Sequence, residues 1–165
     1  MGLFVVIETW LCYSSHKMQG NVKVGIVIVI PRMNKKIIKK DLNQIKLRAR
    51  KAAQNDGHEI CGLLIDNGHY IEIFETKNIS TNGGHFEYDG KQIRNIMKSV
   101  RNIDHEIIGT FHSHPAYVAE PGENDINYAV DGSLMLIIDC IGNEAKLWRI
   151  KNKKARELKF KTVEV

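Results

Sequence analysis

The chain has 165 residues, of which 43% are hydrophobic and 26% charged, and its formal net charge is +5. This length and apolar content predict one globular domain with its own hydrophobic core. No apolar run approaches the roughly 20 residues that a membrane-spanning helix needs. The apolar start Met1–Tyr13 is interrupted by Glu8 and has no Lys or Arg before it, so it does not fit a secretory signal. We therefore expect a cytoplasmic protein without a membrane partner.

The basic charge balance raises the alternative of a nucleic-acid-binding protein. The positive residues are spread over a predicted helix, Lys35–Lys51, and over C-terminal strands, Lys146–Lys161, where solvated faces explain them. Binding of single-stranded nucleic acid also uses aromatic side chains among the basic ones, and Trp10 and Trp148 lie far apart in the sequence. Nucleic acid is therefore the weaker alternative as a partner.

The three cysteines, Cys12, Cys61 and Cys140, are an odd number without paired spacing. The sequence has no Cys-x-x-Cys, so it supports neither a disulfide framework nor a cysteine-based structural zinc site. Cys61 and Cys140 lie in apolar segments, and we expect both to be small buried hydrophobic residues.

In chain order, residues 1–21 form an N-terminal extension of unknown role, and residues 22–165 are predicted to form a single domain. Val22–Ile30 is aliphatic and β-branched up to Pro31, which predicts an internal strand. Lys35–Gln54 carries one apolar stripe, which predicts a helix ended by Asn55-Asp56-Gly57. The members of that stripe are Ile38, Leu42, Ile45, Ala49 and Ala52.

A hairpin and a second helix are predicted next. Glu59–Asp66 and His69–Thr76 are apolar runs joined by Asn67-Gly68, a strong hairpin signal, and His85–Tyr88 is predicted as a third strand. Asp89 is the expected cap of the following helix, with Gln92 at the reciprocal position. The stripe that this helix would bury consists of Ile93, Ile96, Met97, Val100 and Ile103.

The remaining chain reads mainly as strands. Glu106–Phe111 is predicted as a buried strand and is followed by the loop Ala116–Asn124 and a short helix, Asp125–Val130. The three strands predicted after it are Ser133–Cys140, Ala145–Lys151 and Arg156–Val163. Strands mixed with two good helices, without a strict βαβ rhythm, predict an α/β domain in which helices flank a mixed central sheet.

Two histidines follow the predicted strand Glu106–Phe111. Residues two apart on a strand project to the same face, so the imidazoles of His112 and His114 should point the same way. Ten residues separate His114 from a carboxylate, that of Asp125. Two imidazoles and one carboxylate are the protein ligands of many catalytic zinc sites, which leave the fourth position for water.

Together with an acid placed before an apolar strand, this arrangement resembles the JAMM (JAB/MPN-plus) zinc metallopeptidases, in particular stand-alone prokaryotic ones. The family pattern is Glu before a Cys-Gly-Leu-Leu strand, then His-Ser/Thr-His, seven residues that begin with Pro, Ser, two residues, and Asp. The resemblance covers roughly Val24 to Ile150, and the serine three residues before the aspartate is replaced by Gly122. The matching positions are Glu59, His112, Ser113, His114, Pro115 and Asp125.

The resemblance implies a cytidine-deaminase-like three-layer fold and one Zn²⁺ per chain, held by His112, His114 and Asp125. Glu59 would be the catalytic general base, taking a proton from the zinc-bound water and passing it to the leaving amine. Ser113 is expected to face away from the histidines and to form supporting hydrogen bonds. Gly122 replaces a serine that stabilises the oxyanion in the family, so the enzyme is expected to be active but slow.

The substrate implied by the resemblance is the C-terminal tail of a ubiquitin-like or sulfur-carrier protein. The reaction would be hydrolysis of the bond after that tail, either an isopeptide or a linear peptide bond. Two alternatives stay open: a zinc-bound JAB/MPN binding module with weak catalysis, because of Gly122, and the less favoured nucleic-acid-binding protein. The sequence does not determine the oligomeric state.

Overall fold

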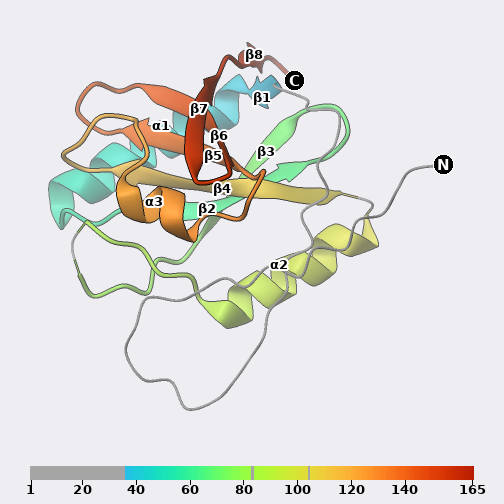
Figure 1. The fold of residues 1–165 in the computed structure, drawn as a ribbon, viewed down its shortest axis with the longest axis horizontal. Helices are drawn as coiled ribbons and strands as arrows, with labels where there is room; N and C mark the ends of the chain where they lie inside the picture. Colours follow the sequence, from blue (N-terminus) through green and yellow to red (C-terminus); the bar gives the residue numbers. More distant parts are fainter. Residues whose placement is uncertain (1–35, 83, 104) are drawn as a thin grey trace.

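The computed structural model describes residues 36–82, 84–103 and 105–165 (Figure 1). The predicted extension, residues 1–21, and the predicted strand Val22–Ile30 lie outside the described residues. Within the described part of the chain the elements are β1 (Lys36–Ile38), α1 (Lys39–Asn55), β2 (Cys61–Asp66), β3 (Ile71–Thr76), α2 (Gly90–Asn102), β4 (Glu106–His114), α3 (Glu123–Tyr128), β5 (Leu134–Asp139), β6 (Ala145–Lys151), β7 (Lys154–Leu158) and β8 (Lys161–Val163).

The described strands form one mixed sheet in the order β7-β6-β5-β4-β2-β3-β1-β8. Strand β4 lies near the middle, antiparallel to β2 and parallel to β5. The predicted hairpin is confirmed, because β2 and β3 pair antiparallel from Cys61–Thr76 to Asp66–Ile71. The mixed sheet with flanking helices confirms the predicted α/β class.

Helices cover both faces of the sheet because each strand alternates its side chains between them. The apolar stripe of α1 packs on one face, and the stripe of α2 packs on the other, beside β4 (Figure 1). The first cluster contains Leu42, Ile45 and Ala49 with Leu64, Phe111 and Leu136. The second contains Ile93, Ile96 and Val100 with Leu63, Ile65 and Ile107. A third cluster joins Ile126 of α3 to Met135 and Ile137 of β5.

A β-bulge in β4 sets the direction of the side chains that follow it. Ile107 pairs with Ile65 and Gly109 with Leu64, which leaves Ile108 as an extra residue. Gly109 is required here, because a Cβ on this residue would lie 2.0 Å from the Leu134 carbonyl oxygen. Phe111 then packs with α1, so alternation directs the side chains of residues 112 and 114 to the opposite face.

Four sequence predictions about these elements are wrong in detail. The first helix begins at Lys39 rather than Lys35, because residues 36–38 form β1 and pair with β3 and β8. The predicted strand Arg156–Val163 is two strands, β7 and β8, at opposite ends of the sheet. His85–Tyr88 makes only an isolated bridge, Asn78 to Tyr88. The short helix α3 begins two residues before Asp125.

The N-terminus of α2 is capped as predicted by Asp89, whose side chain accepts hydrogen bonds from the backbone N–H groups of Lys91 and Gln92. The predicted reciprocal capping contact of Gln92 is wrong, because the Gln92 side chain instead accepts a hydrogen bond from the Lys77 N–H. The prediction that Ile103 belongs to the buried stripe of α2 is wrong, because Ile103 follows the helix and is 58% exposed. No helix among the described residues is long and apolar enough to span a membrane.

Candidate metal centre

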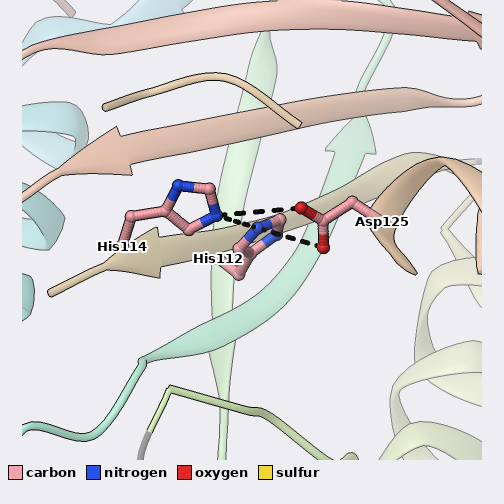
Figure 2. A group of neighbouring side chains, drawn as sticks. All are labelled: His112, His114 and Asp125. Atoms are coloured by element: carbon pink, nitrogen blue, oxygen red, sulfur yellow. Dashed lines mark hydrogen bonds and ion pairs between the residues drawn. The ribbon is translucent and has the colours of Figure 1, made fainter. Parts of the chain in front are cut away.

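The C-terminal end of β4 presents two buried imidazoles to the same side of the sheet. The Nε2 atoms of His112 and His114 lie 3.0 Å apart, and the ring centroids are separated by 4.9 Å. Both histidines are buried, His112 completely. Figure 2 shows that the two rings converge on one carboxylate, that of Asp125 from α3. The spacing of two residues therefore produces the shared orientation that the sequence predicts.

Asp125 lies in the first turn of α3 and closes the cluster. Its Oδ1 lies 3.5 Å from His112 Nε2, and its Oδ2 lies 3.8 Å from His114 Nε2. Oδ2 also accepts a hydrogen bond of 2.7 Å from the Gly122 N–H, which fixes the carboxylate at the helix start. Burial alone would raise the pKa of Asp125, but its interactions with the two histidines and Gly122 hold that pKa far below its usual range.

His114 is oriented by a second hydrogen bond on its other ring nitrogen. Its Nδ1 lies 2.8 Å from the Val118 carbonyl oxygen, which can only accept, so Nδ1 carries the proton and Nε2 is free to present a lone pair. Burial would lower the pKa of His114, yet its interactions with Asp125 and Val118 raise it overall. The depressed pKa of the Asp125 carboxylate and the raised pKa of the His114 imidazole share a cause, because each group stabilises the charged form of the other.

The donor atoms fit a zinc ion in number, type and spacing. The ligand atoms of His112, His114 and Asp125 all lie within 4.8 Å of one another. Zinc bonds of about 2.0–2.1 Å in a tetrahedral shell place ligand atoms about 3.3 Å apart. The observed separations of 3.0, 3.5 and 3.8 Å lie on both sides of that value. The cluster can therefore hold a metal ion with little movement of its side chains.

Glu59 lies beside the histidines without belonging to the cluster. In the antiparallel pairing of β2 and β4, Cys61 is opposite His112, so two residues earlier Glu59 comes opposite His114. The side chain is 8% exposed. Burial is the main cause that raises the pKa of the Glu59 carboxyl; attraction to the histidines opposes this shift and repulsion from Asp125 adds to it. Glu59 is thus within electrostatic reach of all three candidate ligands.

Ser113 points to the face opposite the histidines and connects the two strands of the site. Its Oγ accepts a hydrogen bond of 3.0 Å from the Ile60 N–H, and its own N–H donates to the Ile60 carbonyl at 3.0 Å. The histidine-bearing end of β4 is therefore joined to the residue that follows Glu59. The contact supports the site. Because the Ser113 hydroxyl points away from the histidines, it is not placed to act as a nucleophile.

Gly122 is the residue that precedes the first turn of α3. Its φ of −74° and ψ of 173° are accessible to any residue with a side chain. A Cβ built at this position would meet only the Asp125 Oδ2, at 3.4 Å. The glycine is therefore not required by backbone strain, and the position has room for a serine.

Sequence reasoning missed Asn78, whose side chain uses its full hydrogen-bonding capacity next to the site. Its Nδ2 donates to the carbonyl oxygens of Glu59 at 2.8 Å and His85 at 3.0 Å. Its Oδ1 accepts from the N–H groups of Ser80 at 2.9 Å and Glu87 at 3.0 Å. Asn is common in short turns such as the one that Asn78 forms with Ser80, so the sequence could suggest that turn. The contact with Glu59 spans 19 residues and has no sequence signature.

Replacing Asn78 by aspartate should destabilise the protein by about 1–3 kcal/mol, because two donors are lost and a carboxylate oxygen is placed against two carbonyl oxygens. The urea midpoint of unfolding measures this. Asn82→Asp is the matched control, since Asn82 is exposed in the same segment. Equal midpoints for the two variants would show that the hydrogen bonds of Asn78 contribute nothing to stability.

Comparison with known proteins shows the family of the chain. The model of prokaryotic homologs of the JAB domain matches residues 43–151, which is more than half of the chain. A solution structure of a protein from Desulfitobacterium hafniense is similar at 27% identity, with a TM-score of 0.67 over 79% of this chain and 93% of that one. A search of curated proteins found no match.

Two further structures share the fold at lower identity. One is a JAB1/MPN domain protein from Archaeoglobus fulgidus, with 20% identity and a TM-score of 0.52 over 78% of this chain and 99% of that one. The other is described as JAMM, a metalloprotease-like zinc site in the proteasome and signalosome, with 18% identity and a TM-score of 0.50 over 80% of this chain and all of that one. Supported by the matched family model, the chain belongs to the prokaryotic homologs of the JAB domain.

Proposed function

We propose that this protein is a zinc-dependent metallopeptidase of the JAMM type. The observation that carries the proposal is the convergence of His112, His114 and Asp125 on one point, with the buried carboxyl of Glu59 beside them. Family membership supports it, because one structure of this fold is described as a metalloprotease-like zinc site. His112, His114 and Asp125 would hold the ion.

The zinc ion and Glu59 would have separate roles in hydrolysis. A bound zinc ion would act as a Lewis acid and lower the pKa of a coordinated water to roughly 7. Glu59 would accept a proton from the attacking water and donate it to the nitrogen of the departing amine, which cannot leave as an anion. Burial favours this role, because the raised pKa of Glu59 makes its carboxylate a stronger base than an exposed one.

For the substrate we propose the C-terminal tail of a ubiquitin-like or sulfur-carrier protein, with cleavage of the bond that follows it. The resemblance to JAMM isopeptidases supports this class. Both histidines are buried at the end of β4, and an extended tail of small residues can approach such a centre closely. Cleavage of a fusion to such a tail tests the substrate class.

A second candidate is a zinc-bound JAB/MPN domain that binds such a tail and cleaves it poorly. The observation that favours it is Gly122, which offers no hydroxyl next to Asp125. Loss of one oxyanion donor lowers turnover by about 10²–10³. The two candidates share the metal centre and differ in turnover, so a kinetic measurement separates them.

The metal itself is tested by elemental analysis of protein purified without chelator, which should contain about one zinc per chain. His112→Ala and Asp125→Ala should each lose most of it, because two remaining ligands hold zinc weakly. His69→Ala is the matched control, since His69 is exposed in the β2–β3 turn. Failure of the wild-type protein to bind zinc, even after zinc is added, would overturn the proposal.

A further inference from the structure

The two histidines of the candidate metal centre are held in different ways. His114 donates from Nδ1 to the Val118 carbonyl. The Nδ1 of His112 is buried and has no hydrogen-bond partner within the described part of the chain. Histidine ligands of metals almost always donate from the second ring nitrogen, and that bond fixes the ring orientation. Among the described residues, the orientation of His112 therefore depends on contacts other than a hydrogen bond on Nδ1.

The neighbours of His112 on the sheet supply no acceptor. Its partner on β2 is Cys61 and its partner on β5 is Ile137. The Cys61 thiol already interacts with the Thr76 hydroxyl, at 3.7 Å. An aromatic contact is present instead: the ring of Phe86 stacks on the imidazole of His112, with centroids 4.9 Å apart and an angle of 26° between the planes.

Phe86 is itself fixed from two directions. The segment 78–88 is closed on itself by the hydrogen bond from the Ile79 N–H to the Glu87 carbonyl, at 2.9 Å, and by the hydrogen bonds of Asn78. On its other side, Phe86 makes an edge contact with Tyr88, with centroids 5.3 Å apart. Tyr88 packs against the cluster that α2 forms with the sheet. The ring that covers His112 is therefore connected to the core.

We propose that Phe86 is the positioning residue of His112 and that it fixes the orientation of the imidazole by stacking. It would do for His112 what the Val118 carbonyl does for His114 by accepting a hydrogen bond. An aromatic ring at this distance restricts rotation of the imidazole, which directs Nε2 toward His114 and Asp125. The inference rests on the proposed zinc site, and it concerns metal affinity rather than the chemistry of Glu59.

Zinc affinity, measured by competition with a chromophoric chelator, tests the proposal. Phe86→Leu keeps an apolar cover but removes the stack, and it should weaken zinc binding about tenfold, the lower end of the effect of a residue that orients a metal ligand. Phe86→Tyr retains the ring and should bind zinc as the wild type does. Phe74→Leu is the matched control, because Phe74 is 44% exposed on β3, which β2 separates from β4.

A second readout on the zinc-free protein does not depend on metal binding or activity. The ring protons of His112 should show an upfield ring-current shift in the NMR spectrum, and Phe86→Leu should remove it while Phe86→Tyr keeps it. The proposal is overturned if the wild type lacks this shift, or if a folded Phe86→Leu binds zinc as tightly as the wild type. A wild-type protein that shows the shift but binds no zinc would instead contradict the proposed function.

Discussion

Replacing Glu59 by glutamine should lower the turnover number by about 10²–10⁴ while the protein retains its zinc. The amide has the shape of the carboxyl but cannot accept the proton of the attacking water. Zinc should stay bound because the metal cluster consists of His112, His114 and Asp125. The measurement combines elemental analysis with the kinetics of cleavage of a ubiquitin-like fusion at the bond after its tail.

The stability of this variant provides an internal check. Burial raises the pKa of Glu59, which means that the folded protein disfavours its charged form. A neutral glutamine should therefore leave the melting temperature unchanged or higher. Glu123→Gln is the matched control, because Glu123 is an exposed carboxylate at the start of α3. Loss of zinc from Glu59→Gln would mean that Glu59 is a ligand, and unchanged turnover would exclude it as the base.

Replacing Gly122 by serine should raise kcat by up to about 10²–10³ with little change in KM, because a donor to the oxyanion acts only when charge develops. The backbone conformation at position 122 and the space around it both accept a serine side chain. The φ of Gly122 is −74°, and an added Cβ meets only the Asp125 Oδ2, at 3.4 Å. Serine is also favoured at the position before a helix, so the melting temperature should not fall.

Gly122→Ala is the matched control, since it adds the same Cβ without a hydroxyl and should not increase kcat. An increase in kcat for serine alone would show that the natural site lacks an oxyanion donor, as the weak-catalysis alternative requires. If Gly122→Ser folds, retains zinc and is no faster than the wild type, another group already supplies the donor. The glycine would then be a functional variant of the family pattern.

Many of the elements could be predicted because their signals are local. The β2–β3 hairpin follows from two apolar runs around Asn67-Gly68, and Ala145–Lys151 was predicted with the bounds of β6. The α2 stripe needs only a period of 3.6 residues, since helical hydrogen bonds join residues close in sequence. The shared direction of His112 and His114 is equally local, because it follows from the alternation of one strand.

The errors occur where long-range pairing decides the structure. Residues 36–38 continue a helical pattern in sequence, yet they form a strand because β3 and β8 offer them hydrogen-bonding partners. β8 leaves the β6–β7 hairpin and crosses to the opposite end of the sheet. An alternating hydrophobic pattern identifies a strand but does not tell which edge of the sheet the strand joins, since both edges present the same backbone groups.

The sequence by itself determined which residue types stand at positions 59, 112, 114 and 125 and how they are spaced, and their resemblance to the JAMM pattern predicted a metal-dependent hydrolase. Only the tertiary structure decided how those residues are held. The contact of Asn78 with Glu59, the stack of Phe86 on His112 and the ordinary φ of Gly122 had no pattern in the sequence. The reason is physical: ligand identity is a property of single residues, whereas orientation arises from contacts between segments that only folding brings together.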